Sequence, residues 1–395
     1  MATGKERGIV SCASYEAKRA GVERGMRLFE AKRICPELII LPSDYETYSI
    51  YSERMFDIIR RFSPSVEEYS IDEAFCDLTG LRRVYRTSYP GIAKKIKSEI
   101  EKELDIVVSV GLSSTKTLSK ICSKHSKPNG FMALPGYCLH EFLKDIPTEK
   151  VCGFGPNTVQ LLDKCGVRTV LDYISRPADF AGKLLGKTGL ELWHELRGEL
   201  VYKMCLEKKE KYLSISKSKT FMPASNKKDF VKGQLIRNLE SACIKLRRHR
   251  LSAAVITAYL RMSDFRECGL KAKLNRHSSS TLDFAGICVE LFDEMFDPAL
   301  FYRATGVIVS DIAAEGIDAR TLFDDPLKIE KVLRVSKAID EINEKFGKHT
   351  VHIAASNAAG IKRSHPRSEI ARRKRDLLKG ETFRRRLKIP MLDLK

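Results

Sequence analysis

Apolar residues recur at helical and at extended spacing in alternating stretches over the first 143 residues of the chain. Helical spacing predicts helices over residues 14–22, 28–34, 47–62, 90–104 and 115–124. Extended apolar runs predict strands over residues 8–12, 66–71, 74–78 and 106–111. Gly21 and Pro36 mark the ends of the first two helices. Strands and helices mixed in this way predict an α+β layered domain.

A different order of elements follows in residues 214–312. Extended runs predict strands over 216–221, 253–262, 269–274 and 301–310, and helical spacing predicts helices over 229–249 and 282–296. The order β-α-β-β-α-β is that of a ferredoxin-like split unit. Residues 144–210 have the pattern of a separate helical module, and residues 207–219 that of a linker rich in Lys, Glu and Ser. A last helix is predicted over residues 327–346.

Composition fits a multidomain protein. A chain of 395 residues with 43% hydrophobic content is long enough for two to four domains with real cores. No apolar run approaches the ~20 residues of a membrane span, and the first residues contain no apolar signal segment. We therefore expect a soluble cytosolic protein. The 11 cysteines include no Cys-x-x-Cys pair, so we expect neither a structural zinc site nor disulfides.

The net charge of +19 indicates a polyanionic partner, and nucleic acid is the leading candidate. Residues 359–395 carry 13 Lys/Arg and 4 Asp/Glu, about half of the excess, and the rest is spread over the chain. A membrane surface is the alternative, but no long amphipathic helix with a bulky apolar face supports it.

An acidic pair, Asp72 and Glu73, separates the extended runs at residues 66–71 and 74–78. Neighbouring residues of a regular strand point to opposite faces, so two adjacent carboxylates that serve one site need a bend such as a hairpin tip. Carboxylate oxygens are hard ligands that suit Mg²⁺, and Mg²⁺ suits phosphate chemistry. An acidic turn on a solvated hairpin is the alternative, because paired acids are common in turns.

The residues around this pair resemble a known signature. The run Tyr-Ser-Ile-Asp-Glu-Ala-Phe at residues 69–75 is similar to the signature of the Y-family, or translesion, DNA polymerases, and its continuation through Gly80 resembles the UmuC branch. The resemblance implies an α+β multidomain, right-hand polymerase with fingers, a ferredoxin-like palm, a helical thumb and a little finger. It also implies two catalytic Mg²⁺ ions, with Asp72 binding both and Glu73 assisting one.

Three further residues match positions at which the family contacts the incoming nucleotide. Tyr15 and Lys18 lie in residues 1–45, the expected partial palm and fingers, where the family has Tyr and Arg. Lysine at position 18 keeps the charge but lacks the bidentate fork of arginine. Lys127, in the run Ser-Lys-Pro-Asn-Gly, matches a lysine that reaches the triphosphate. The alternative for both lysines is a solvated surface position.

The helical module at residues 144–210 resembles the polymerase thumb. Gly153 and Gly155 form a tight turn before a helix, which aims backbone N–H groups outward and suits phosphate binding without sequence readout. The turn resembles a helix-hairpin-helix motif, and an ordinary helix–helix turn is the alternative. The single tryptophan, Trp193, is expected to be a core residue rather than a base-stacking one.

Residues 214–312 resemble the little finger, the additional DNA-gripping domain of the family. Basic residues lie on or beside its predicted strands and are candidates for contacts with the DNA backbone: Lys217, Lys219, Lys271, Lys273 and Arg276. Protection of edge strands against aggregation is the alternative role for such charges.

Residues 313–395 are expected to form a basic C-terminal tail. Leu322 and Phe323 lie in a run similar to the sliding-clamp-binding peptide of related polymerases, although Ala319 stands where Gln is usual; a helix staple is the alternative. The arginine-rich clusters at residues 372–375 and 384–386 are typical of segments that order on binding. His349 and His352 have no carboxylate or Cys near them in sequence, so we expect them to be structural.

The resemblance begins at about residue 7 and omits the opening strand that carries the family's first metal-binding Asp and its steric gate. Residues 1–13 contain one acidic residue, Glu6. We expect a start codon upstream of Met1; a family divided into two chains and a decayed, inactive remnant are the alternatives. The palm is thus expected over residues 46–143 without its first strand.

These features predict a template-directed DNA polymerase that copies damaged DNA in repair and SOS-type mutagenesis. The resemblance implies primer-template DNA, dNTPs, a sliding clamp, an accessory subunit and a recombinase filament as partners, and a location at the cytoplasmic nucleoid. A non-catalytic protein that binds damaged DNA or primer-templates is the second hypothesis. A helix-hairpin-helix nuclease or repair glycosylase is a third, but it lacks a matching catalytic constellation.

Overall fold

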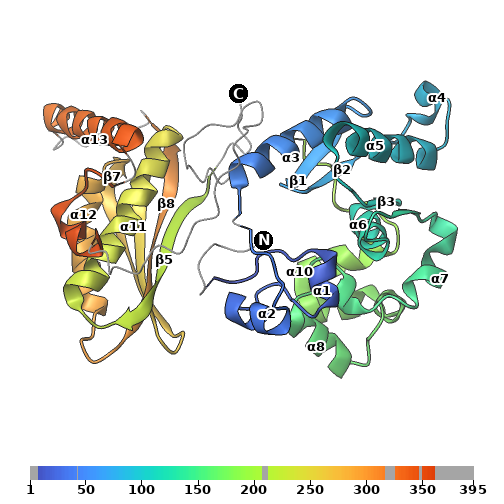
Figure 1. Cartoon of the computed structure of the whole chain (residues 1–395), viewed down its shortest axis with the longest axis horizontal. Helices are drawn as coiled ribbons and strands as arrows, with labels where there is room; N and C mark the ends of the chain where they lie inside the picture. Colours follow the sequence, from blue (N-terminus) through green and yellow to red (C-terminus); the bar gives the residue numbers. More distant parts are fainter. Residues whose placement is uncertain (1–7, 42, 207–211, 316–324, 347–348, 361–395) are drawn as a thin grey trace. The chain divides into compact units, whose positions relative to one another are not determined.

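The computed structural model describes residues 8–41, 43–206, 212–315, 325–346 and 349–360. Contacts between Cα atoms divide the chain into two compact units with a boundary between residues 207 and 208. Figure 1 shows both units, and each is described here by itself. No helix in the described ranges is long and apolar enough to cross a bilayer.

Unit 1 combines short strands with many helices. Its strands are β1 (Val66–Ser70), β2 (Glu73–Cys76), β3 (Val110–Leu112) and β4 (Phe131–Ala133). Its first helices are α1 (Tyr15–Arg19), α2 (Leu28–Ile34), α3 (Tyr45–Arg60), α4 (Arg82–Tyr85), α5 (Tyr89–Leu104) and α6 (Lys116–His125). Its later helices are α7 (Leu139–Leu143), α8 (Pro156–Lys164), α9 (Val170–Ser175) and α10 (Ala178–Leu196).

The predicted acidic hairpin is present and packs on two amphipathic helices. Strand β1 pairs antiparallel with β2, and residues 71 and 72 form the turn between them. Their core-facing side chains join the apolar stripes of α3 and α5 in one buried cluster. The stripe of α5 has the spacing expected from the sequence, with Ile92, Ile96, Ile100 and Leu104 all buried.

Two glycines let α6 lie directly against the parallel pair β3–β4. A Cβ atom on Gly111 would lie 2.0 Å from the Ser119 carbonyl oxygen. A Cβ on Gly130 would lie 1.8 Å from the Ser126 carbonyl oxygen. Neither position accepts a side chain, so the strand ends and the helix approach each other at backbone distance. This approach fixes where the side chains of α6 can reach.

Two predicted strands of unit 1 are largely absent. The run at residues 106–111 was expected to be a buried strand, but only β3 is extended and paired, and Val107 is 65% exposed. Residues 106–109 find no partner strand among the described residues, so their apolar spacing does not yield a ladder. The run at residues 8–12 forms a single bridge, between Ile9 and Arg27.

A second core of unit 1 joins α6 to the helices of residues 139–196. Leu118 and Ile121 of α6 pack in the same buried cluster as Leu162 and Leu196. Glu195 is fully buried and accepts hydrogen bonds from the backbone N–H groups of Thr117 (3.2 Å), Val201 (2.9 Å) and Tyr202 (2.8 Å). This carboxylate therefore holds the start of α6, the end of α10 and the chain that follows it.

Unit 2 has the predicted element order β-α-β-β-α-β. Its elements are β5 (Ser214–Ser225), α11 (Lys228–Arg248), β6 (Leu251–Met262), β7 (Glu267–Ser278), α12 (Thr281–Met295) and β8 (Tyr302–Ala314), followed by α13 (Pro326–Phe346). The sheet order is β5-β8-β6-β7 with antiparallel neighbours, so β8 separates the parallel strands β5 and β6. The split unit expected from the sequence is confirmed.

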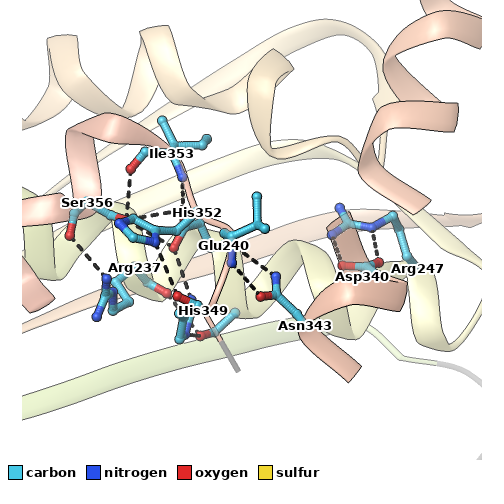
Figure 2. A network of polar contacts seen from close by, with 11 residues as sticks. Arg237, Glu240, Arg247, Asp340, Asn343, His349, His352, Ile353 and Ser356 are labelled. Carbon is cyan, nitrogen blue, oxygen red and sulfur yellow. Dashed lines mark hydrogen bonds and ion pairs between the residues drawn. The ribbon is translucent and has the colours of Figure 1, made fainter. Parts of the chain in front are cut away.

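The last part of unit 2 is held on α11 by buried polar groups. Glu240 of α11 is 5% exposed and accepts hydrogen bonds from the Ile353 backbone N–H (2.7 Å) and the Ser356 hydroxyl (3.2 Å). His349 Nδ1 lies 3.2 Å from its other carboxylate oxygen. Arg247 pairs with Asp340 of α13 through two nitrogens at 2.6 and 2.8 Å. Figure 2 shows this network, which we call the clasp (residues 326–360).

Candidate active site

The acidic pair lies at the tip of the β1–β2 hairpin. Asp72 occupies the turn and is exposed, and its Oδ1 accepts a hydrogen bond of 2.7 Å from the Ser70 hydroxyl. Glu73 is the first residue of β2 and pairs with Ser70 across the hairpin at a register shift. The bend required for two adjacent carboxylates to serve one site is therefore present.

Lys120 of α6 reaches the second carboxylate of the pair. Its Nζ donates to Glu73 Oε2 at 2.8 Å and lies 4.2 Å from the centroid of the Tyr69 ring. Burial lowers the pKa of Lys120, but the hydrogen bond to the Glu73 carboxylate and neighbouring negative charge more than offset this, and the net shift is upward. The Cys152 sulfur raises the pKa of Tyr69, against the opposing charge of Lys120. Lys120 is consequently a cation next to the acidic pair.

A second lysine of α6, one turn earlier, pairs with the base of the hairpin. Lys116 Nζ donates to Glu67 Oε2 at 2.7 Å and to the Lys203 carbonyl at 2.9 Å. The same Glu67 oxygen accepts from the Cys205 backbone N–H at 2.7 Å. The spacing of Lys116 and Lys120 places both on one face of α6. Sequence reasoning assigned neither lysine a role, although their i, i+4 spacing was visible.

The donor set at the tip suits a magnesium ion that also binds a substrate. Asp72 and Glu73 offer hard carboxylate oxygens, and Mg²⁺ is often held by one or two carboxylates with phosphates and waters completing its shell. Among the described residues no group of three or more His, Cys, Asp or Glu could enclose a metal ion. The two carboxylates fit an open, substrate-completed site rather than a closed protein cage.

The residues expected to bind the nucleotide lie on separate elements. Tyr15 and Lys18 are exposed on α1, with the Lys18 Nζ 4.8 Å from the centroid of the Tyr15 ring. Lys127 is exposed in the loop between α6 and β4. In the described ranges, no hydrogen bond or ion pair joins any of the three to Asp72 or Glu73.

The loop that carries Lys127 is nevertheless well anchored. Asn129, two residues later, has a left-handed φ of 53° and accepts a hydrogen bond from Lys97 of α5. The Gly130 N–H donates to the Ser109 hydroxyl at 3.2 Å. These bonds fix the loop against the core of the hairpin region.

The glycine turn in the helical module has the predicted shape. Gly153 has a φ of 109°, and a Cβ there would meet Leu192 at 3.0 Å. Gly155 is the N-cap of α8 and faces open space. Trp193 packs against the neighbouring core, and its indole N–H donates to the Arg176 carbonyl at 2.9 Å. It is a packing residue, as the sequence suggested.

The basic residues of unit 2 do not share one surface. Lys271 pairs with Thr257 and Lys273 with Val255, so both lie on the sheet face away from the helices. Lys217 pairs with Val307, whose side chain lies in the helix-covered core, so Lys217 lies on the opposite face. Arg276 donates to Asp283 of α12 at 2.7 Å.

Two further predictions concern the clamp-binding residues and the two histidines, His349 and His352. Leu322 and Phe323, the expected clamp-binding residues, lie outside the described residues, as does the arginine-rich tail. His349 contacts the carboxylate of Glu240 in α11, far away in sequence, and His352 Nδ1 lies 3.2 Å from the His349 carbonyl oxygen. Both histidines belong to the clasp, in keeping with a structural role (Figure 2).

Family comparisons agree with the two-unit architecture. Residues 1–124 match the impB/mucB/samB family, and residues 213–322 match the C-terminal domain of that family. The chain is 33% identical over 312 residues to DNA polymerase IV of Lactococcus lactis subsp. cremoris (strain SK11), covering 78% of this chain and 84% of that protein. It is 28% identical to DNA polymerase IV of Bacillus velezensis, covering 96% of this chain and 91% of that protein.

The fold is shared with solved polymerase structures. A Y-family DNA polymerase chimera superposes with a TM-score of 0.67 at 23% identity, covering 80% of this chain and 91% of that one. Fold and matched domains together define a right-hand, DNA-directed DNA polymerase. The chain belongs to the Y family of DNA polymerases, whose members carry out translesion synthesis and use divalent metal ions. Because these relatives are named DNA polymerase IV, a closer kinship with the UmuC branch stays a prediction.

Proposed function

We propose that this chain synthesises DNA across damaged templates by two-Mg²⁺ nucleotidyl transfer at the hairpin tip. The observation that carries the proposal is the turn that brings Asp72 and Glu73 to one end of β1–β2, with Lys120 bonded to Glu73. Asp72 and Glu73 would hold the metal ions, which supply Lewis-acid activation and charge neutralisation in phosphoryl transfer. Ser70 orients Asp72 and Lys120 orients Glu73 through their hydrogen bonds.

Nucleotide binding is assigned to three basic or aromatic residues outside the hairpin. Lys127 would contact the triphosphate from its anchored loop, and Tyr15 and Lys18 would contact it from α1. Lysine binds phosphate as a point charge and tyrosine through its hydroxyl, so these contacts position the nucleotide without selecting its base.

Further assignments follow the family. We propose residues 1–45 as part of the palm and the fingers, 46–143 as palm, 144–210 as thumb and 214–312 as little finger. Of the expected basic tail at residues 313–395, the clasp at residues 326–360 packs on α11 of unit 2. Gly153 and Gly155 would contact the DNA backbone, as would Lys271 and Lys273 on the sheet face away from the helices. Leu322 and Phe323 would bind a sliding clamp. We also propose an accessory subunit and a recombinase filament as partners, and SOS-type induction of the protein.

Primer extension by this chain with Mg²⁺ and dNTPs tests the proposal. Asp72→Asn removes one negative charge but keeps the shape of the side chain, so we expect extension to fall by at least about a hundredfold while DNA binding is retained. Asp77→Asn, four residues beyond the pair, is the matched control and should extend normally. Equal extension by Asp72→Asn and the unsubstituted chain would refute the assignment.

A non-catalytic DNA-binding role is the second candidate. The observation that favours it is that two carboxylates, rather than three or more, gather at the tip within the described ranges. A chain of this kind would bind primer-template with normal affinity and extend no primer under any metal condition. Extension by the unsubstituted 395-residue chain excludes it.

A further inference from the structure

Three arginines follow the hairpin on a surface of unit 1 that the proposed reaction does not use. Arg82, Arg83 and Arg86 are exposed on and just after α4, and we call them the arginine cluster. They line a surface hollow together with Gly80, Thr87 and Tyr89. Figure 1 shows α4 beside the N-terminal end of α5. No carboxylate lines this hollow.

The arginine cluster differs from five other cations of the same region. Arg60, Arg61, Lys116 and Lys120 pair with carboxylates of neighbouring elements, and Lys97 pairs with Glu101 of its own helix. Within the described part of the chain, the cluster has no ion pair, and its one ring contact is Arg82 over Tyr89 at 5.6 Å. Like charges that line one hollow repel each other, and an anion bound between them would relieve this repulsion.

The backbone beneath the cluster is held in place. The Tyr85 hydroxyl donates to the carbonyls of Arg61 (3.2 Å) and Phe62 (3.0 Å), and its ring stacks on Phe62. The Gly80 N–H donates to the Tyr89 hydroxyl at 3.2 Å. Arg86 adopts a left-handed φ of 47°, which is uncommon for a residue with a long side chain. The guanidinium groups therefore start from a fixed scaffold, which lowers the entropy cost of binding.

We propose that the arginine cluster is a second nucleic-acid contact, which binds the phosphodiester backbone away from the acidic pair. The cluster follows the base of the hairpin, whereas Asp72 lies at its tip; the five residues of β1 separate these ends by about 16 Å. Guanidinium forks match phosphate oxygens in charge and geometry. An acidic protein is the less favoured partner, because a protein–protein interface normally has an apolar core. The aromatic ring that lines this hollow, Tyr89, is covered by Arg82.

The test measures binding of a fluorescein-labelled single-stranded oligonucleotide at several salt concentrations. Replacing all three arginines by Ala should lower the slope of log K against log salt by about 2, because each phosphate contact on a single strand contributes about 0.7. Affinity near 0.1 M salt should fall at least about tenfold. Replacing the same three by Lys should keep most of the slope, because the charge remains.

The matched control removes the same charge elsewhere on unit 1. Lys95, Lys183 and Lys187 are exposed, and their triple Ala variant should change the slope by less than 0.5, a value well below one full phosphate contact. Circular dichroism melting verifies that each variant is folded. An unchanged slope in the arginine variant overturns the proposal. Loss of polyglutamate binding with intact oligonucleotide binding overturns it in favour of an acidic protein.

Primer extension separates this proposal from the proposed function. The arginine variant should still extend a short primer-template at saturating DNA, because the cluster does not touch the acidic pair. Absent extension in every variant, with the altered salt slope, would refute polymerase activity and leave the second contact standing. Normal extension with an unaltered slope would support polymerase activity and refute the second contact.

Discussion

At the scale of single residues, Lys120 is the contact that ties α6 to the acidic pair. Its amine bonds Glu73 at 2.8 Å and covers the Tyr69 ring. The side chain of Glu73 is 40% exposed, so water screens the pair and its contribution to stability is small, about 0–1 kcal/mol. Its importance should therefore lie in orienting the carboxylate rather than in holding the fold.

We predict that Lys120→Met lowers the rate of primer extension about tenfold or more but changes the free energy of unfolding by less than about 1 kcal/mol. Glu73 then lacks the donor that fixes its orientation. Single-turnover extension and urea denaturation measure the two quantities. Lys124→Met, one turn later on α6, is the control. A large loss of stability with normal extension would contradict this role.

Glu195 should matter for stability rather than for catalysis, because its fully buried carboxylate accepts hydrogen bonds from three backbone N–H groups. Glu195→Gln keeps the shape but replaces one acceptor oxygen by a donor facing those N–H groups. We predict a loss of about 2–3 kcal/mol in the free energy of unfolding. Glu199→Gln, at a side chain that is 53% exposed, should change it by less than about 0.5 kcal/mol. Urea denaturation of both variants is the measurement.

Sequence reasoning found the acidic pair but not the residues that hold it. Asp72 and Glu73 are adjacent and form a recognisable run, so their site is local in sequence. Lys120 is 47 residues from Glu73, and the Thr117 N–H is 78 residues from Glu195. Such pairings depend on the packing of α6 against the hairpin region and against α10, which no periodicity reveals.

At the scale of elements, prediction succeeded where one face of an element is buried. Helix α5 and the elements of unit 2 appear within a few residues of their predicted bounds, because their apolar spacing is that of a helix or strand with a single covered face. The prediction of a strand was wrong for residues 106–109, because strand formation needs a neighbouring strand as well as apolar residues. The faces of the basic residues in unit 2 also depend on register, which spacing alone does not fix.

Helix α9 offers a test of element stability against pH. Thr169 and Asp172 form a capping box at its start. The Thr169 backbone N–H, followed by that of Arg168, holds the pKa of Asp172 below its ordinary value of 3.8. Because the folded pKa is lower than the unfolded one, the carboxylate stabilises the fold above pH 3.8, and this stabilisation is lost as the pH falls through the folded pKa.

We therefore predict that Asp172→Asn lowers the free energy of unfolding by about 1 kcal/mol at pH 7 and by progressively less below pH 3.8. Urea denaturation across pH 2.5–7 gives the comparison. Asp179→Asn removes a carboxylate that is 83% exposed and paired with Lys183. It should leave the free energy of unfolding almost unchanged at both pH 2.5 and pH 7. A difference that grows in acid would contradict the assignment.

At the scale of the whole molecule, the chain consists of two units with separate cores. The boundary at residues 207 and 208 lies at the start of the stretch, residues 207–219, that the sequence indicated as a linker. The clasp was not predicted as a part of unit 2. Its anchors are a buried carboxylate and an arginine on α11, and both pair with residues about 90 or more positions later.

The clasp should contribute substantially to the free energy of unfolding of unit 2. Residues 208–366 should unfold in one cooperative transition, because they contain a complete core. Ending the chain at residue 324 removes α13 and the segment that covers α11, where Ile353 packs on the core and a Cβ on Gly233 would lie 2.9 Å from the Ala359 nitrogen. It also leaves Glu240 and Arg247 without their partners.

We predict that the shortened fragment loses about 3 kcal/mol or more in its free energy of unfolding. Urea denaturation of both fragments is the measurement. Equal midpoints with equal slopes would show that the clasp contributes nothing to the unit on which it lies.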